Sequence, residues 1–98
     1  MERGDQISAY YRRLTSDDDN TRKAAARAWS VWEGSTSYLI QNPDHIAHAG
    51  EDDFAVAFAR IECHYFVNKI FLEDNAILAN IDKIQGIPGV IIQGRYDV

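Results

Sequence analysis

The sequence predicts a mainly α-helical fold followed by one core β-strand. Apolar residues recur at three- and four-residue spacing near the N-terminus, and two later stretches are rich in good helix formers. The third observation is a run of β-branched residues at 90–92, which follows the turn signal Pro88-Gly89. An unbroken apolar run of this kind is typical of a strand buried on both faces, as in a parallel sheet.

Helical periodicity and helix-end signals define the first two helices. Residues from about 5 to 14 place Ile7, Tyr10, Tyr11 and Leu14 on one face, which predicts a short amphipathic helix. The acidic segment TSDDDN then offers N-cap candidates for a second helix, which we expect from about residue 19 to Gly34. Glycine at that position is typical of a C′ residue.

The second half contains one long helix, a short helical piece and the strand. Residues 35–50 have loop character, and the long helix is expected from the acids at 51–53 to about residue 71. The short piece, NAILANIDKI, ends before Gly86, and the strand is expected at about 89–94.

Composition excludes several classes of function. Ninety-eight residues allow one domain with a modest core. The chain carries 10 basic against 15 acidic residues, and the basic ones are scattered, so nucleic acid is not an expected partner. No apolar segment is long enough for a membrane span, and the polar N-terminus is unlike a signal peptide. The single cysteine, Cys63, cannot form an internal disulfide, which favours a reducing cytoplasm.

Two carboxylates lie where ordinary surface acids are not expected. Glu33 ends its helix, where the negative end of the helix dipole disfavours an anion. Glu62 lies in the middle of the long helix among aromatic residues at helical spacing. Such a carboxylate needs a cation or a shifted pKa. Two interpretations stay open: Glu62 pairs with Arg60 or Lys69 while Glu33 frays into solvent, or both acids point into one pocket and hold a cationic ligand.

Other candidate sites have simpler explanations. His45 and His48, with Asp44 and Glu51, lie in a loop without a zinc-binding pattern, so we expect solvated or capping roles and no metal site. Cys63 and His64 are adjacent and diverge on a helix, so they cannot form a nucleophile–base pair, and Cys63 is expected to be a small core residue. One stripe of apolar residues along that helix is interpreted as core packing: Phe54, Ala57, Phe58, Ile61 and Tyr65.

Three segments together resemble the proline iminopeptidases, serine peptidases of the α/β-hydrolase fold: AAARAWSVWE, EDDFAVAFARIECHYF and IPGVIIQGRYDV. The resemblance implies a helical cap region at 1–86, then a core strand and triad-acid loop of the hydrolase domain at 87–98. In GRYD, Asp97 matches the acid that orients the catalytic histidine. In WE and ARIE, Glu33 and Glu62 match the glutamates that bind the amino group of an N-terminal proline.

The chain also departs from the family pattern. It contains no G-x-S-x-G nucleophile elbow and no HGG oxyanion motif, and its histidines lie in cap segments. We therefore expect a fragment of about a third of an enzyme, inactive alone, with no cofactor and with peptides bearing N-terminal proline as the substrates of the parent. The alternative is a small non-enzymatic helical module that binds a partner or itself. Self-association of the isolated fragment is expected, because the strand at 90–94 would have unpaired edges and the pocket face of the cap would be bare.

Overall fold

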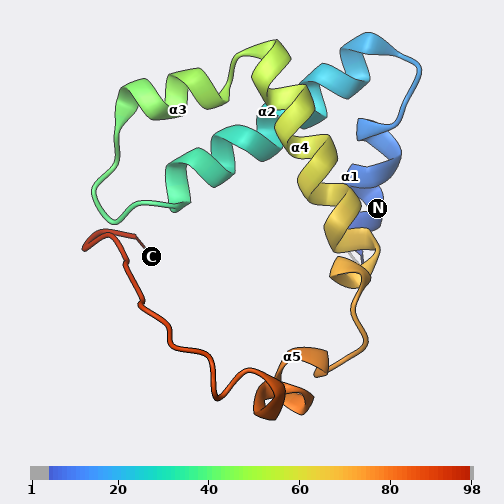
Figure 1. Ribbon diagram of the computed structural model, residues 1–98. Helices are drawn as coiled ribbons and strands as arrows, with labels where there is room; N and C mark the ends of the chain where they lie inside the picture. The colour runs from blue at the N-terminus through green and yellow to red at the C-terminus, as the bar shows by residue number, and fades with distance from the viewer. Residues whose placement is uncertain (1–4, 98) are drawn as a thin grey trace.

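A computed structural model describes residues 5–97, and the mainly α-helical prediction is confirmed (Figure 1). Five α-helices are described: α1 (Gln6–Leu14), α2 (Asp19–Thr36), α3 (Pro43–Ala49), α4 (Asp52–Val67) and α5 (Ala76–Ala79). Two 3₁₀ turns, η1 (Lys69–Phe71) and η2 (Ile81–Lys83), flank α5. None of the described helices is both long and apolar enough to cross a membrane.

The first two helices begin at side-chain caps. Asp5 accepts a hydrogen bond from the Ser8 backbone N–H at 3.0 Å, and Asp18 accepts one from the Thr21 N–H at 2.8 Å. These bonds satisfy donors that the first helical turn leaves without a partner. They also lower the pKa of both aspartates, because they stabilise the charged carboxylate.

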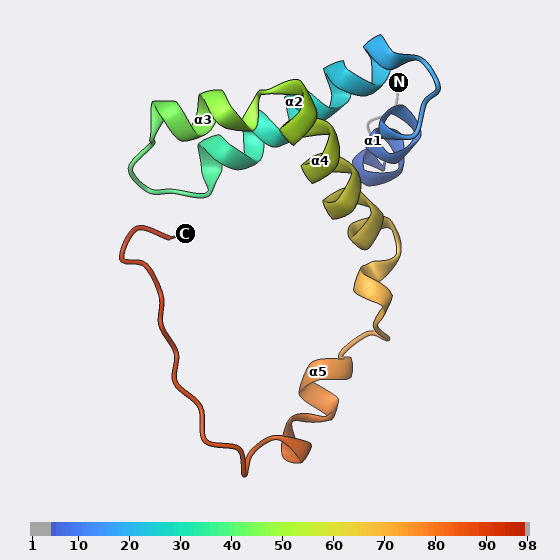
Figure 2. The same ribbon diagram turned by 45° about the horizontal axis from the view of Figure 1, so that its top comes forward.

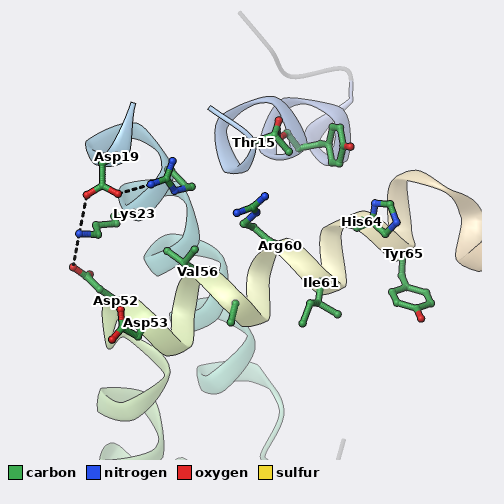
Figure 3. Close-up of a pocket in the computed structure, with 13 residues that line it drawn as sticks. Thr15, Asp19, Lys23, Asp52, Asp53, Val56, Arg60, Ile61, His64 and Tyr65 are labelled. Carbon is green, nitrogen blue, oxygen red and sulfur yellow. Dashed lines mark hydrogen bonds and ion pairs between the residues drawn. The ribbon is translucent and has the colours of Figure 1, made fainter. Parts of the chain in front are cut away.

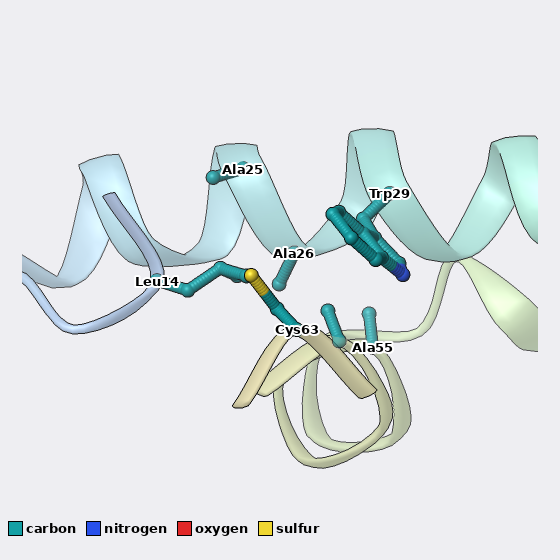
Figure 4. Packing of buried hydrophobic residues seen from close by; sticks show 7 residues of the cluster. Leu14, Ala25, Ala26, Trp29, Ala55 and Cys63 are labelled. Atoms are coloured by element: carbon teal, nitrogen blue, oxygen red, sulfur yellow. The ribbon is translucent and has the colours of Figure 1, made fainter. Parts of the chain in front are cut away.

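The core lies where α1, α2 and α4 meet (Figure 4). Its buried residues are mostly small, which lets the helices approach closely: Leu14, Ala25, Ala26, Trp29, Ala55, Ala59 and Cys63. Of the five α4 residues predicted to pack in the core, only Phe58 does so, as a partly buried residue. The prediction is wrong for the other four, which are exposed (Ile61 keeps 62% of its surface): Phe54, Ala57, Ile61 and Tyr65. The α4 face of small residues packs inward instead.

Gly34 does not end α2, which continues to Thr36. A Cβ added at Gly34 would lie 3.0 Å from the Cβ of Ala49, so the missing side chain makes room for α3. The predicted loop at 35–50 is also wrong in part, because it contains α3. That helix has Pro43 in its first turn, and Asn42 caps it by accepting hydrogen bonds from two backbone N–H groups.

The long helix ends earlier than expected, at Val67 rather than near residue 71. Three successive residues after it, Lys69, Ile70 and Phe71, have φ between 52° and 58°. Left-handed backbone of this kind is unfavourable for residues with a Cβ, and a single turn of it redirects the chain away from the helices. Figure 2 shows the chain leaving α4 here and continuing to α5.

The predicted strand at about 89–94 does not form, and no β-strand is present among the described residues. The chain is extended there, and the side chains of Val90, Ile91 and Ile92 are 87–94% exposed. A strand needs neighbouring strands for its backbone hydrogen bonds, and this chain supplies none along residues 89–94. The tail returns only at its end, where Leu39 donates a backbone hydrogen bond to Tyr96 at 2.9 Å.

Candidate functional site

The packing of α2 on α4 places Glu33 and Glu62 near enough for the charge of one to act on the other. Glu33 lies near the end of α2 and Glu62 in the middle of α4, and both side chains are half-buried. Burial raises the pKa of Glu33, and the negative charge of Glu62 raises it further. The two carboxylates therefore act on one another although they come from different helices.

Aromatic side chains wall the space beside Glu33. A hollow of about 500 Å³ lies here, with Glu33 on its wall. The ring of Tyr10 packs edge-on against the ring of Trp29, with centroids 5.1 Å apart. The ring of Phe66 is tilted relative to that of Trp29, with a centroid distance of 6.0 Å. The other lining residues are Gln6, Ile7, Ala28 and Trp32. An aromatic wall beside a carboxylate suits a cation with apolar substituents.

Glu62 is connected to the same hollow through Trp29. The indole Nε1–H of Trp29 donates a hydrogen bond to Oε2 of Glu62 at 2.6 Å. Within residues 5–97 neither Glu33 nor Glu62 forms an ion pair, and Lys69 lies 3.9 Å from Asp74 instead. The alternative in which Glu62 pairs with Arg60 or Lys69 is therefore not found, and Glu33 does not fray, since α2 continues beyond it.

Asp97 has no described contact with Glu33 or Glu62. It is exposed and forms an isolated antiparallel bridge with Tyr38, in the segment after α2. Its backbone N–H also donates to the carbonyl of Gly94 at 3.4 Å. The tail thus holds Asp97 at a surface position, and no contact described here joins it to Glu33 or Glu62.

A larger groove of about 870 Å³, lined by both charged and apolar side chains, lies between α4 and the first two helices (Figure 3). It shares no lining residue with the hollow beside Glu33. Its acids are largely matched by bases, since Lys23 lies 2.8 Å from Asp19 and 3.8 Å from Asp52. The smaller hollow is the stronger candidate because Glu33 on its wall, and Glu62 behind Trp29, lack such partners within residues 5–97.

The remaining candidate residues have structural contacts. His45 packs edge-on against Tyr38 with centroids 5.1 Å apart, and His48 lies 3.2 Å from Glu51. Within the described part of the chain, no three His, Cys, Asp or Glu side chains gather as metal ligands would. Cys63 is buried, as predicted for a small core residue, and burial raises the pKa of its thiol.

Sequence reasoning missed the role of Trp29. Its position four residues before Glu33 was visible in the sequence, but its partner Glu62 lies 33 positions away. Tyr10 was assigned to an amphipathic face, and nothing in the sequence connects α1 to this hollow. These contacts arise from how the helices cross.

Comparisons with known proteins confirm the resemblance stated from the sequence. The chain is 61% identical over 98 residues to a probable proline iminopeptidase of Leptolyngbya boryana, covering 99% of this chain and 30% of that protein. It is 58% identical to the proline iminopeptidase of Xylella fastidiosa (strain 9a5c), covering all of this chain and 32% of that protein. For the Arabidopsis thaliana proline iminopeptidase the identity is 52%, over 99% of this chain and 26% of that protein.

The chain thus spans about a third of the length of the curated relatives it matches. No family model matches it.

Proposed function

We propose that the chain is the part of a proline iminopeptidase that recognises the substrate's free amino group and supplies the triad acid. One observation carries the proposal: two half-buried carboxylates, Glu33 and Glu62, interact beside an aromatic-walled hollow and have no cationic partner within residues 5–97. The names of the relatives support the same substrate, an N-terminal proline.

The chemistry of an N-terminal proline fits this hollow. Its secondary ammonium carries one positive charge on an apolar five-membered ring, so the charge needs anions while the ring needs apolar walls. Glu33 and Glu62 supply the anions, and Tyr10, Trp29 and Phe66 supply the walls. Binding the cation offsets both causes that raise the pKa of Glu33, which are burial and, second, the charge of Glu62.

In the full-length protein, residues 1–86 form the helical cap and residues 87–98 form a core strand and the acid loop. The exposed β-branched run at 90–92 supports this division, because such side chains suit a strand with neighbours on both sides. Asp97 then follows the strand and orients the catalytic histidine. The segments of this chain that match the family do not include that histidine. The isolated chain is inactive because nucleophile and base are absent.

Kinetics of glutamine variants in the full-length protein test the proposal. Glu33→Gln and Glu62→Gln each remove one charge while keeping shape, and we expect kcat/KM on prolyl amides to fall about tenfold to a hundredfold. Esters without an amine should react at the unchanged rate. The double variant should lose less than the product of the two single losses, because both acids act on one cation.

Glu73→Gln is the matched control, since Glu73 is exposed and lies away from the hollow. We expect it to leave both substrates unaffected. Equal losses on prolyl amides and amine-free esters in the Glu33 and Glu62 variants would mean that these acids support the fold, and the proposal would be overturned.

A second candidate is self-association of the chain through its tail. The exposure of Val90, Ile91 and Ile92 favours it, because an extended apolar segment with unpaired backbone groups can pair with a second copy. Sedimentation of the 98-residue chain should show dimers that Ile91→Lys abolishes. A monomer at every concentration would exclude this candidate.

A further inference from the structure

The indole of Trp29 is the one hydrogen-bond donor that the described residues provide to Glu62. Trp29 is buried, with 8% of its surface exposed, and its Nε1 lies 2.6 Å from Oε2 of Glu62. A buried indole N–H needs an acceptor, and here the acceptor is a charged carboxylate rather than a backbone carbonyl. The hydrogen bond connects α2 to α4 across 33 positions of sequence.

The Trp29 ring is held from several sides. Tyr10 of α1 packs against it edge-on, Phe66 of α4 lies at 6.0 Å, and the ring belongs to the buried core cluster (Figure 4). The direction of the Nε1–H bond is therefore fixed by packing before any ligand arrives. A donor fixed in this way fixes its acceptor as well.

One oxygen of Glu62 stays available. Oε2 accepts the indole hydrogen bond, whereas Oε1 takes part in no hydrogen bond or ion pair among residues 5–97. A carboxylate on a flexible side chain would otherwise rotate away from the repelling charge of Glu33. The hydrogen bond opposes that rotation.

We propose that Trp29 is a positioning residue: its indole N–H holds the Glu62 carboxylate so that the remaining oxygen meets a substrate ammonium together with Glu33. This inference rests on the proposed function of the two glutamates. Trp29 acts through Glu62, and its ring also forms part of the apolar wall of the hollow.

The first test is spectroscopic and does not depend on catalysis. The chain has two tryptophans, so indole ¹⁵N labelling gives one resonance for Trp29 and one for Trp32, which is 63% exposed and serves as the internal reference. We expect the Trp29 N–H to exchange slowly with solvent and to move when Glu62→Gln is introduced. A Trp29 indole resonance whose position is the same with and without Glu62→Gln would overturn the inference.

The second test separates the donor from the ring. Replacing Trp29 by benzothienylalanine keeps the bicyclic shape but puts sulfur where the N–H stands, and Trp29→Phe provides a genetically simple counterpart. In the full-length protein we expect about a tenfold loss of kcat/KM on prolyl amides, mainly through KM, with amine-free esters unchanged. In the Glu62→Gln background the further loss should disappear.

The outcomes distinguish this inference from the function on which it rests. An amine-specific loss at Glu62→Gln with none at position 29 overturns the positioning role and leaves the proposed function standing. Losses at the two positions that simply multiply, or that affect esters equally, assign Trp29 a structural role and overturn the inference. No amine-specific loss at either position overturns both.

Discussion

The chain after α4, residues 68–97, is richer in large apolar residues than residues 5–67, yet only residues 5–67 have a core. Every buried residue described lies within 5–67, and none lies within 68–97. The Cα radius of gyration is 16.8 Å, whereas a compact domain of this length has about 13 Å. Figure 1 shows the reason: after α4 the chain leaves the other helices, continues through α5 and comes back toward them only at its C-terminal end.

The difference lies in where each segment finds its hydrogen-bond partners. A helix satisfies its backbone groups within itself, so α1, α2 and α4 form and then pack through small side chains. The residues at 90–92 can exchange water for protein hydrogen-bond partners only against other strands, and without such strands their apolar side chains stay in water. Hydrophobicity alone does not make a core.

The largest effect should come from the tail, although it contributes nothing to the core. In the full-length protein, Asp97→Asn should lower kcat on prolyl amides by about 10⁴, as loss of a triad acid does when the geometry is otherwise kept. The same change in the 98-residue chain should leave its helicity and unfolding midpoint unaltered, because Asp97 is exposed. Activity within tenfold of the parent would remove Asp97 from the triad.

A matched pair of truncations measures the stability difference between the two regions. Leu14→Ala removes a side chain that is almost fully buried, and we expect it to lower the free energy of unfolding by about 2–5 kcal/mol. Ile91→Ala, in the tail, should change it by less than about 0.5 kcal/mol. Urea titrations followed by helical circular dichroism give both values, and similar losses would mean that the tail packs after all.

Within the helical part, Glu33 should make stability depend on pH. Its pKa is raised in the folded chain above the ordinary value of 4.5, so the folded state binds the proton more tightly than the unfolded state does. Above the raised pKa, the ionised Glu33 side chain therefore lowers the free energy of unfolding. This loss of stability disappears as the pH falls below the ordinary pKa of a glutamate. We expect Glu33→Gln to stabilise the chain at neutral pH and to make no difference at about pH 4.

Unfolding curves of Glu33→Gln and the exposed control Glu73→Gln, measured at both pH values, check this expectation. A stabilisation by Glu33→Gln that persists unchanged into acid would show that charge is not its cause.

The smallest effect concerns the contact between α2 and α3. Gly34→Ala improves helix propensity by about 1 kcal/mol, but its Cβ would lie 3.0 Å from that of Ala49. We expect the two effects nearly to cancel, leaving a net loss below about 1 kcal/mol. The double variant Gly34→Ala with Ala49→Gly should be more stable than the two single changes predict together. Strict additivity in thermal unfolding would indicate that α3 moves freely away from α2.

Local signals explain which elements were predictable and which were not. The caps Asp5 and Asp18, and the periodicity behind them, define α1 and α2 without any tertiary information. The cap of α3, Asn42 followed by Pro43, is equally local, but a helix of only seven residues gives too short a periodic pattern to predict. Gly34 does not mark the end of α2, because a glycine can serve packing as well as a helix terminus.

Short-range spacing and motifs suffice to predict that the chain is helical, which residues carry its unusual charges, and which family it resembles. The other features come from the tertiary structure. It selected Ala55, Ala59 and Cys63 over Ile61 and Tyr65 as the inward face of α4, since small residues let the helices approach closely. It placed the indole of Trp29 on Glu62, because a contact across 33 positions depends on how two helices cross. It also left the apolar run at 90–92 unpaired, because a strand takes its structure from neighbours and not from its own residues.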